Sequence, residues 1–169
     1  PVTGQRSDSR FTNSSAHPVP GPCRQKPTGQ ARARTLEARQ DGFKAWVRLD
    51  LTEAYEWPGL LKLTREVRHD AQGRGEVHIV DEARFSEPQR FESVLVTDRL
   101  TTGSDGQHHL SRGQASLRLV VDSDVPVTWI SESQSDQGTS WTVVRIRTRD
   151  AVGSARITAR FLPDPPDAA

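Results

Sequence analysis

Alternation of apolar and polar residues is the feature that most restricts the fold of this chain. Residues 45–52 carry Ala, Val, Leu and Leu at every second position, with Trp, Arg, Asp and Thr between them. A repeat of two is that of a β-strand with one buried face. Similar runs recur as far as residue 162, separated by turn signals such as Pro58-Gly59. Because no amphipathic helical segment lies between them, we expect about eight antiparallel strands in a sandwich or barrel.

Proline and apolar residues are distributed unevenly, and this predicts the domain organisation. Residues 1–36 are rich in Ser, Pro, Gly, Gln and Arg, and four prolines fall between residues 18 and 27. Proline lacks the amide donor that a helix interior or a central strand requires. We therefore expect an extended, irregular segment over 1–36, an all-β antiparallel sandwich of about eight or more strands over 37–162, and a flexible tail over 163–169.

Charge and composition limit the partners. The 169 residues include 23 Lys and Arg against 22 Asp and Glu, so the net charge is +1. A balanced chain has no long-range field for nucleic acid, and no run of about 18 apolar residues exists, so we expect neither nucleic acid nor membrane as a partner. The single cysteine, Cys23, excludes an internal disulfide. Methionine is absent even at position 1, which predicts a processed product or a fragment; the compartment stays open among periplasm, cytoplasm and secretion.

The residues do not form a complete catalytic constellation, so none is predicted as catalytic. The five histidines show neither the H-x-x-x-H nor the H-x-H spacing of a metal pair, and nucleotide-binding and nucleophile motifs are absent. The adjacent carboxylates Asp81 and Glu82 face opposite sides of a strand, and Asp81 is predicted to cap a turn at a strand end. Arg145 and Arg147, spaced by two, are predicted to share a solvated sheet face.

Two aromatic side chains are candidates for contact with a substrate. Trp46 falls on the more polar face of the 45–52 strand, where an indole can stack on a sugar ring unless a neighbouring sheet or domain covers it. Tyr55, the only tyrosine, follows the same strand. We expect Tyr55 to pack at the edge of the sandwich, with Asp50 and Thr52 satisfying the backbone of the turn.

Several short motifs follow one another in an order that resembles a known family. They lie at residues 13–20, Gln25, Gly29, residues 31–33, residues 50–55, residues 65–68 and residues 77–82. The order is similar to the C-terminal region of heparinase II/III-like proteins, in which an S-x-x-H-N-x-P segment, a Gln and a Gly precede a D-L-T-x-A-Y element. An R-x-V strand and a strand ending in aspartate come next. The resemblance covers roughly residues 1–100.

This resemblance implies a bacterial polysaccharide lyase that acts on acidic glycans such as glycosaminoglycans and alginate. In that family a helical toroid precedes antiparallel β-sandwich sheets, and the chemistry is β-elimination beside a uronate carboxylate. The acid and base groups come mostly from the toroid and the start of the sandwich. The resemblance thus implies a C-terminal sandwich that supports the enzyme or contacts its substrate and is inactive alone, with the acidic polysaccharide and the toroid of the same parent as partners.

The resemblance also implies a metal position and a further contact residue. His17 matches a histidine that binds a structural zinc in several family members, although Pro18 here replaces the family's asparagine. The other ligands would lie upstream, so the zinc is expected only in an intact parent and no cofactor is expected in this chain. Arg10 matches an arginine before that segment and joins Trp46 and Tyr55 as a substrate-contact candidate. A non-catalytic carbohydrate-binding or domain-packing sandwich stays open as the alternative.

Overall fold

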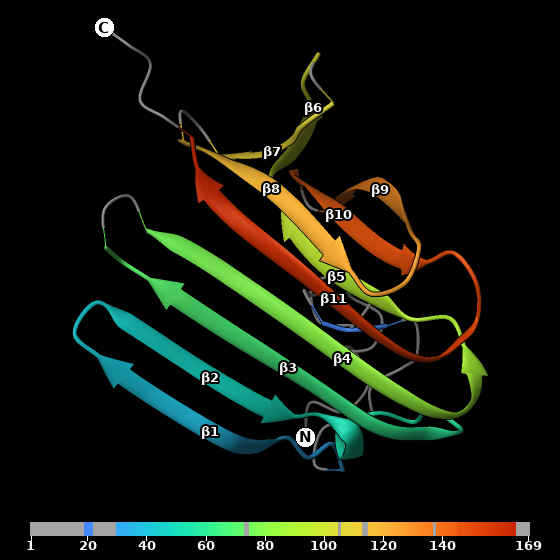
Figure 1. Ribbon diagram of the computed structural model, residues 1–169. Coiled ribbons are helices and arrows are strands. Elements are labelled where there is room, and N and C mark those ends of the chain that lie inside the picture. Colours follow the sequence, from blue (N-terminus) through green and yellow to red (C-terminus); the bar gives the residue numbers. More distant parts are fainter. Residues whose placement is uncertain are drawn as a thin grey trace, which may run out of the picture.

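The chain folds into β-strands joined by short turns (Figure 1). The computed structural model describes residues 19–21, 30–72, 75–104, 106–112, 115–136 and 138–164. One short 3-10 helix, η2 (Thr52–Ala54), lies within them. The eleven strands in the described residues are β1 (Arg34–Asp41), β2 (Lys44–Asp50), β3 (Leu60–Asp70), β4 (Glu76–Gln89), β5 (Glu92–Thr97), β6 (Arg99–Thr102), β7 (His108–Arg112), β8 (Ala115–Ser123), β9 (Val127–Asp136), β10 (Thr139–Thr148) and β11 (Val152–Pro163).

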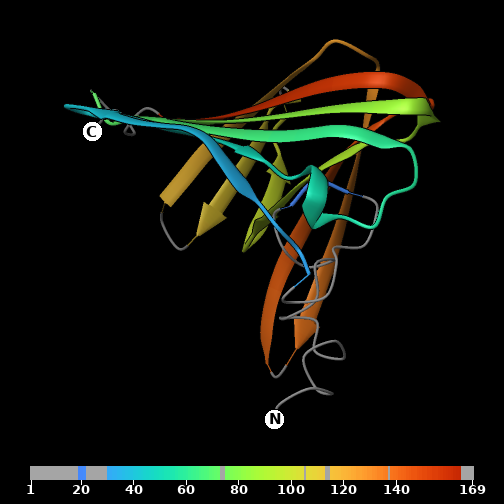
Figure 2. The same ribbon diagram turned by 90° about the horizontal axis from the view of Figure 1, so that it is seen from below.

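Two antiparallel sheets build the molecule. The large sheet has the order β1-β2-β3-β4-β11-β8-β7-β6, and the small sheet has the order β5-β10-β9. Figure 2 shows β3, β4 and β11 side by side in an upper layer, with β9 and β10 below it. The prediction of an all-β antiparallel sandwich is confirmed.

The first strand, β1, begins inside the segment that the sequence predicted to be irregular. It pairs with β2 from Arg34 opposite Asp50 to Asp41 opposite Lys44, with a bulge near Leu36. Nearly all its side chains are exposed because β1 is the edge of the large sheet. Backbone hydrogen bonds to β2 define this strand, so no apolar alternation marks it in the sequence.

The main core lies between the two sheets. Leu63 and Ile157 from the large sheet and Ile146 from the small sheet are fully buried in it. Trp57 packs between two phenylalanines, with its ring centroid 4.9 Å from Phe85 and 6.3 Å from Phe91. Burying a large apolar side chain contributes roughly 1.5–3 kcal/mol, so this aromatic group anchors the segment between β2 and β3 to the core.

The turn after β2 is ordered by two side chains, as predicted. The backbone N–H of Thr52 donates to the Asp50 carboxylate at 3.0 Å, and the backbone N–H of Leu63 donates to the Thr52 hydroxyl at 2.9 Å. η2 follows and directs Tyr55 inward, where it is 4% exposed and lies 6.4 Å from the Trp57 ring. Tyr55 therefore packs, as predicted, but in the main core and not at the edge of the sandwich.

Candidate functional site

A buried ion pair in the large sheet is hydrogen-bonded to the small sheet. Arg65 of β3 donates from Nε and Nη2 to the two carboxylate oxygens of Asp81 on β4, each at 2.6 Å. Ser93 of β5 donates its hydroxyl to the same carboxylate at 2.6 Å. The Asp81 side chain is 0% exposed and that of Arg65 is 9% exposed. A bidentate pair with a third donor is the arrangement that allows two charges to stay inside a core.

The position of Asp81 corrects the prediction that it caps a turn at a strand end. Asp81 lies well inside β4, with Glu82 on the opposite face, as the sequence did predict. The charged Asp81 can occupy a buried position inside β4 because the guanidinium of Arg65, on the neighbouring strand β3, neutralises its carboxylate. Burial alone would lower the pKa of the Arg65 guanidinium, but the Asp81 carboxylate and, to a smaller extent, the Tyr55 phenol raise that pKa above its ordinary value.

A second buried carboxylate sits in the small sheet. Glu92 of β5 is 1% exposed and accepts hydrogen bonds from Arg147 Nε at 2.5 Å and from Arg145 Nη1 at 3.3 Å. The backbone of Glu92 also exchanges two hydrogen bonds of 2.9 Å with Gly21. Arg145 and Arg147 do share one face of β10, but the prediction of a solvated face is wrong. Their charges converge on a buried carboxylate on the neighbouring strand, which no local pattern reveals.

The candidate pocket lies beside the end of β8, where β7 no longer pairs with it. β7 pairs with β8 only from Arg112 opposite Ala115 to His108 opposite Leu119, so residues 120–123 of β8 have no strand partner on that side among the described residues. A pocket of about 350 Å³ opens there, and we call it the β8-edge pocket. It is lined by Gly106, Gln107, His108, Arg118, Leu119, Val120, Val121 and Trp129.

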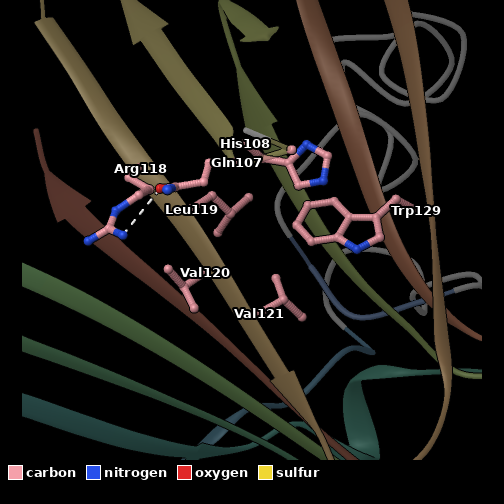
Figure 3. Close-up of a pocket in the computed structure, with 8 residues that line it drawn as sticks. Gln107, His108, Arg118, Leu119, Val120, Val121 and Trp129 are labelled. Carbon is pink, nitrogen blue, oxygen red and sulfur yellow. Dashed lines mark hydrogen bonds between the residues drawn. The ribbon is translucent and has the colours of Figure 1, made fainter. Parts of the chain in front are cut away.

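The walls of the β8-edge pocket differ in chemistry (Figure 3). On one side the His108 imidazole stacks on the Trp129 indole, with ring centroids 4.2 Å apart and planes inclined by 29°. The imidazole Nδ1 lies 3.0 Å from the Thr102 hydroxyl, which fixes the ring. On the other side Arg118 Nη1 donates to the Gln107 side-chain oxygen at 3.2 Å. Leu119 packs in the core beside Trp129, and Arg118, its neighbour on β8, points to the opposite face of the sheet, so the aromatic pair and the Arg118–Gln107 pair lie on opposite faces of this edge.

The residues predicted from sequence do not gather in this pocket. Trp46 lies on β2, on the face away from the core, with the Arg39 guanidinium 4.9 Å from its ring centroid. Tyr55 is in the core. His17 and Arg10 lie outside the described residues, so the zinc and the Arg10 contact stay predictions. In the part of the chain that the structure describes, no three His, Cys, Asp or Glu side chains are grouped to bind a metal ion, and no helix is long and apolar enough to span a membrane.

The fold is an antiparallel β-sandwich, and several solved structures contain a region of similar fold. No family model and no curated protein matches the sequence. A crystal structure of heparinase III superimposes with a TM-score of 0.67 at 14% identity, over 93% of this chain and 25% of that one. A second heparinase III gives 0.72 at 12% identity, over 97% and 26%. The heparan sulfate lyase HepC from Pedobacter heparinus gives 0.72 at 10% identity, over 94% and 26%.

These likenesses establish the fold and its extent. At identities of 10–14% few side chains are shared, so the superpositions show a common fold but say nothing about a common site. Nearly all of this chain is matched, but it spans only about a quarter of the length of the heparinase structures. The chain is thus related in fold to one part of those lyases.

Proposed function

We propose that this chain is the β-sandwich part of a polysaccharide lyase that acts on uronic-acid-containing polysaccharides. In that role it supports the enzyme or contacts the substrate and has no turnover by itself. The observation that carries the proposal is the fold match to heparinase III and heparan sulfate lyase chains, which spans more than nine-tenths of this chain and about a quarter of theirs. The ordered motifs in residues 1–100 point to the same family.

The polar clusters support a non-catalytic role. A base for β-elimination must lie within hydrogen-bond reach of the proton it removes. Asp81 and Glu92, the two most buried carboxylates described, each accept hydrogen bonds from guanidinium groups and are closed to a polysaccharide. We propose that the acid and base of the reaction belong to a helical toroid in the same parent protein, and that a structural zinc bound with the help of His17 belongs to the intact parent.

The proposal is tested by incubating the chain with heparan sulfate, alginate and other uronic-acid polymers. Elimination creates an unsaturated uronate, whose ultraviolet absorbance reports each cleavage. We expect no rise in absorbance with the chain alone. Steady turnover by this chain would show that the catalytic groups are within it and would overturn the non-catalytic role.

A module that packs against another domain, or binds carbohydrate without any enzyme, is the alternative. Val47 of β2 and Val67 of β3 are paired across the inner face of the large sheet but stay only half-buried, which favours a packing role for this face. An array of acidic and neutral glycans separates the two forms of the alternative. Binding to neutral glycans in preference to uronates would support a carbohydrate-binding module, and absence of all glycan binding would support domain packing.

A further inference from the structure

Two cationic side chains face each other across β3 and β4 without an acidic partner. Lys62 of β3 and Arg84 of β4 are directly opposite in the register of the two strands, and both are exposed. Among the described residues, neither side chain makes a hydrogen bond or an ion pair. Like charges directly opposite each other in an antiparallel pair destabilise the sheet. The chain therefore keeps an unfavourable charge pair here, which we call the Lys62–Arg84 pair.

The Lys62–Arg84 pair points away from the core. The next residues along the two strands, Leu63 and Ala83, are buried in the core, and neighbours on a strand alternate between faces. Both cations therefore lie on the outer face of the large sheet, and Ser154 of β11, a strand beside β4 in Figure 1, continues their row. Because directly opposite residues have Cβ atoms about 4.5–5.5 Å apart, both cationic groups can reach one anion at once.

The next carboxylate along this face of β4 does not neutralise the pair. Glu82 lies two residues from Arg84 on the same face, but its two oxygens are contacted by Arg48 Nη2 at 3.2 Å and by Arg156 Nη1 at 3.5 Å. Two guanidinium groups thus already share the single charge of Glu82. This part of the outer face has an excess of positive charge, which a bound anion would neutralise.

The chemistry of the pair fits a carboxylate. A guanidinium can donate two parallel hydrogen bonds to a carboxylate, and an ammonium is a compact charge that can approach the same group from its side. The surface beside the pair is open, since a Cβ added at Gly153, next to Ser154, would meet no atom within 4 Å. A sugar unit that carries a carboxylate can therefore approach this row without displacing any part of the chain.

From these contacts we propose that the Lys62–Arg84 pair binds the carboxylate of one uronate unit of an acidic polysaccharide. The inference rests on the proposed function for its substrate class and adds the place where this chain contacts that substrate. The β8-edge pocket cannot provide this contact for one sugar unit, because its aromatic pair and Arg118 lie on opposite faces of the sheet. Trp46 shares the outer face, but it is opposite Arg68, about 20 Å from Lys62 along β3.

The test is an NMR titration of the isotope-labelled chain with three hexasaccharides. The alginate ligand has carboxylates only, the heparan sulfate ligand has carboxylates and sulfates, and the glucan ligand is neutral. We expect both acidic ligands to shift the amide signals of residues 61–64, 82–86 and 153–156, and the neutral ligand to leave them unchanged. Binding should weaken as NaCl rises from about 50 mM to about 0.5 M, because salt screens exposed charges.

Removing the cations should weaken binding without weakening the fold. Lys62→Gln and Arg84→Gln should each reduce the affinity for the acidic ligands about threefold to fivefold, and the double variant about tenfold or more. Each single variant should also raise the Tm by roughly 1–3 °C, because a like-charge repulsion is lost. Lys62→Glu should abolish binding and raise the Tm further, since an acid opposite Arg84 forms a cross-strand ion pair. Side chains with a merely structural role would lower the Tm when replaced.

Two exposed cations of the same sheet that do have acidic partners are the matched controls. Lys44 is paired with Asp70 at 3.0 Å, and Arg39 is paired with Glu37 at 2.7 Å. Lys44→Gln and Arg39→Gln should bind the acidic ligands as the unaltered chain does, and neither should raise the Tm.

Several results would overturn the assignment. These are no shift with either acidic ligand, shifts confined to other residues, unchanged binding in the double variant, equal binding of the neutral ligand, or a response to heparan sulfate and not to alginate. The proposed function is judged separately, by turnover of uronic-acid polymers by the complete gene product. Turnover together with unchanged binding in the double variant would overturn the site and leave the proposed function in place. Loss of binding in the double variant without turnover by the complete product would do the reverse.

Discussion

Asp81→Ala should destabilise the chain strongly while leaving its surface intact. The Asp81 side chain is fully buried and takes three hydrogen bonds of 2.6 Å from Arg65 and Ser93. Its removal leaves the Arg65 guanidinium, 9% exposed, without its counter-charge in the core. Breaking a buried ion pair from one side costs about 3–5 kcal/mol. For a chain of this size that loss corresponds to a fall in Tm of roughly 6–20 °C. Urea unfolding followed by tryptophan fluorescence measures the free energy directly.

The neighbouring carboxylate is the matched control. Glu82 lies on the opposite face of β4, is 33% exposed and contacts Arg48 at 3.2 Å and Arg156 at 3.5 Å. Glu82→Ala should cost no more than about 1 kcal/mol, because exposed ion pairs contribute little. The double variant Asp81→Leu with Arg65→Met should recover most of the stability, since no buried charge remains. Equal losses for Asp81→Ala and Glu82→Ala would refute this account of the core.

Three further changes test other parts of the structure. Glu92→Ala removes a carboxylate that is 1% exposed and should cost about 2–4 kcal/mol in a thermal melt, against less than about 1 kcal/mol for Glu132→Ala, which is 51% exposed; equal costs would contradict the buried cluster. Gly59→Ala, with φ +78° and a new Cβ only 2.9 Å from a serine hydroxyl, should lose more stability in urea than Gly42→Ala, with φ +53° and nothing within 4 Å. The backbone N–H of Thr52 and, to a smaller extent, the guanidinium of Arg34 lower the pKa of the Asp50 carboxyl in the folded chain below its ordinary value of 3.8. The ionised carboxylate therefore contributes its full stabilisation above pH 3.8, and this stabilisation is lost as the pH falls through the lowered pKa of the folded chain. Unfolding free energies measured from neutral pH to about pH 2 should therefore fall more for the unaltered chain than for Asp50→Asn, and parallel curves would count against this.

The fold could be predicted where burial leaves a period in the sequence. Strands β2, β3 and β10 carry apolar residues on one face, so their alternation is visible without a structure. β1 could not be found this way because it is an exposed edge strand with no buried apolar face. The turn chemistry of Asp50 and Thr52 is local, and it was predicted correctly.

The candidate site could not be predicted because its contacts join distant strands. His108 and Trp129 belong to different sheets, and nothing in the local sequence pairs this histidine with a tryptophan 21 residues later. Likewise, the spacing of Arg145 and Arg147 gives their common face but not Glu92 opposite them. The free edge of β8 follows from the short length of β7, which depends on register and not on composition.

Turnover of a uronic-acid polysaccharide by the complete gene product that contains this sequence tests the central claim most directly. The product and this chain would be compared at equal concentration on heparan sulfate and alginate, with the absorbance of unsaturated uronate as the readout. The account predicts steady turnover of at least one polymer by the complete product and none by the chain alone. A complete product that cleaves none of the uronic-acid polymers, or a chain that cleaves them unaided, would contradict it.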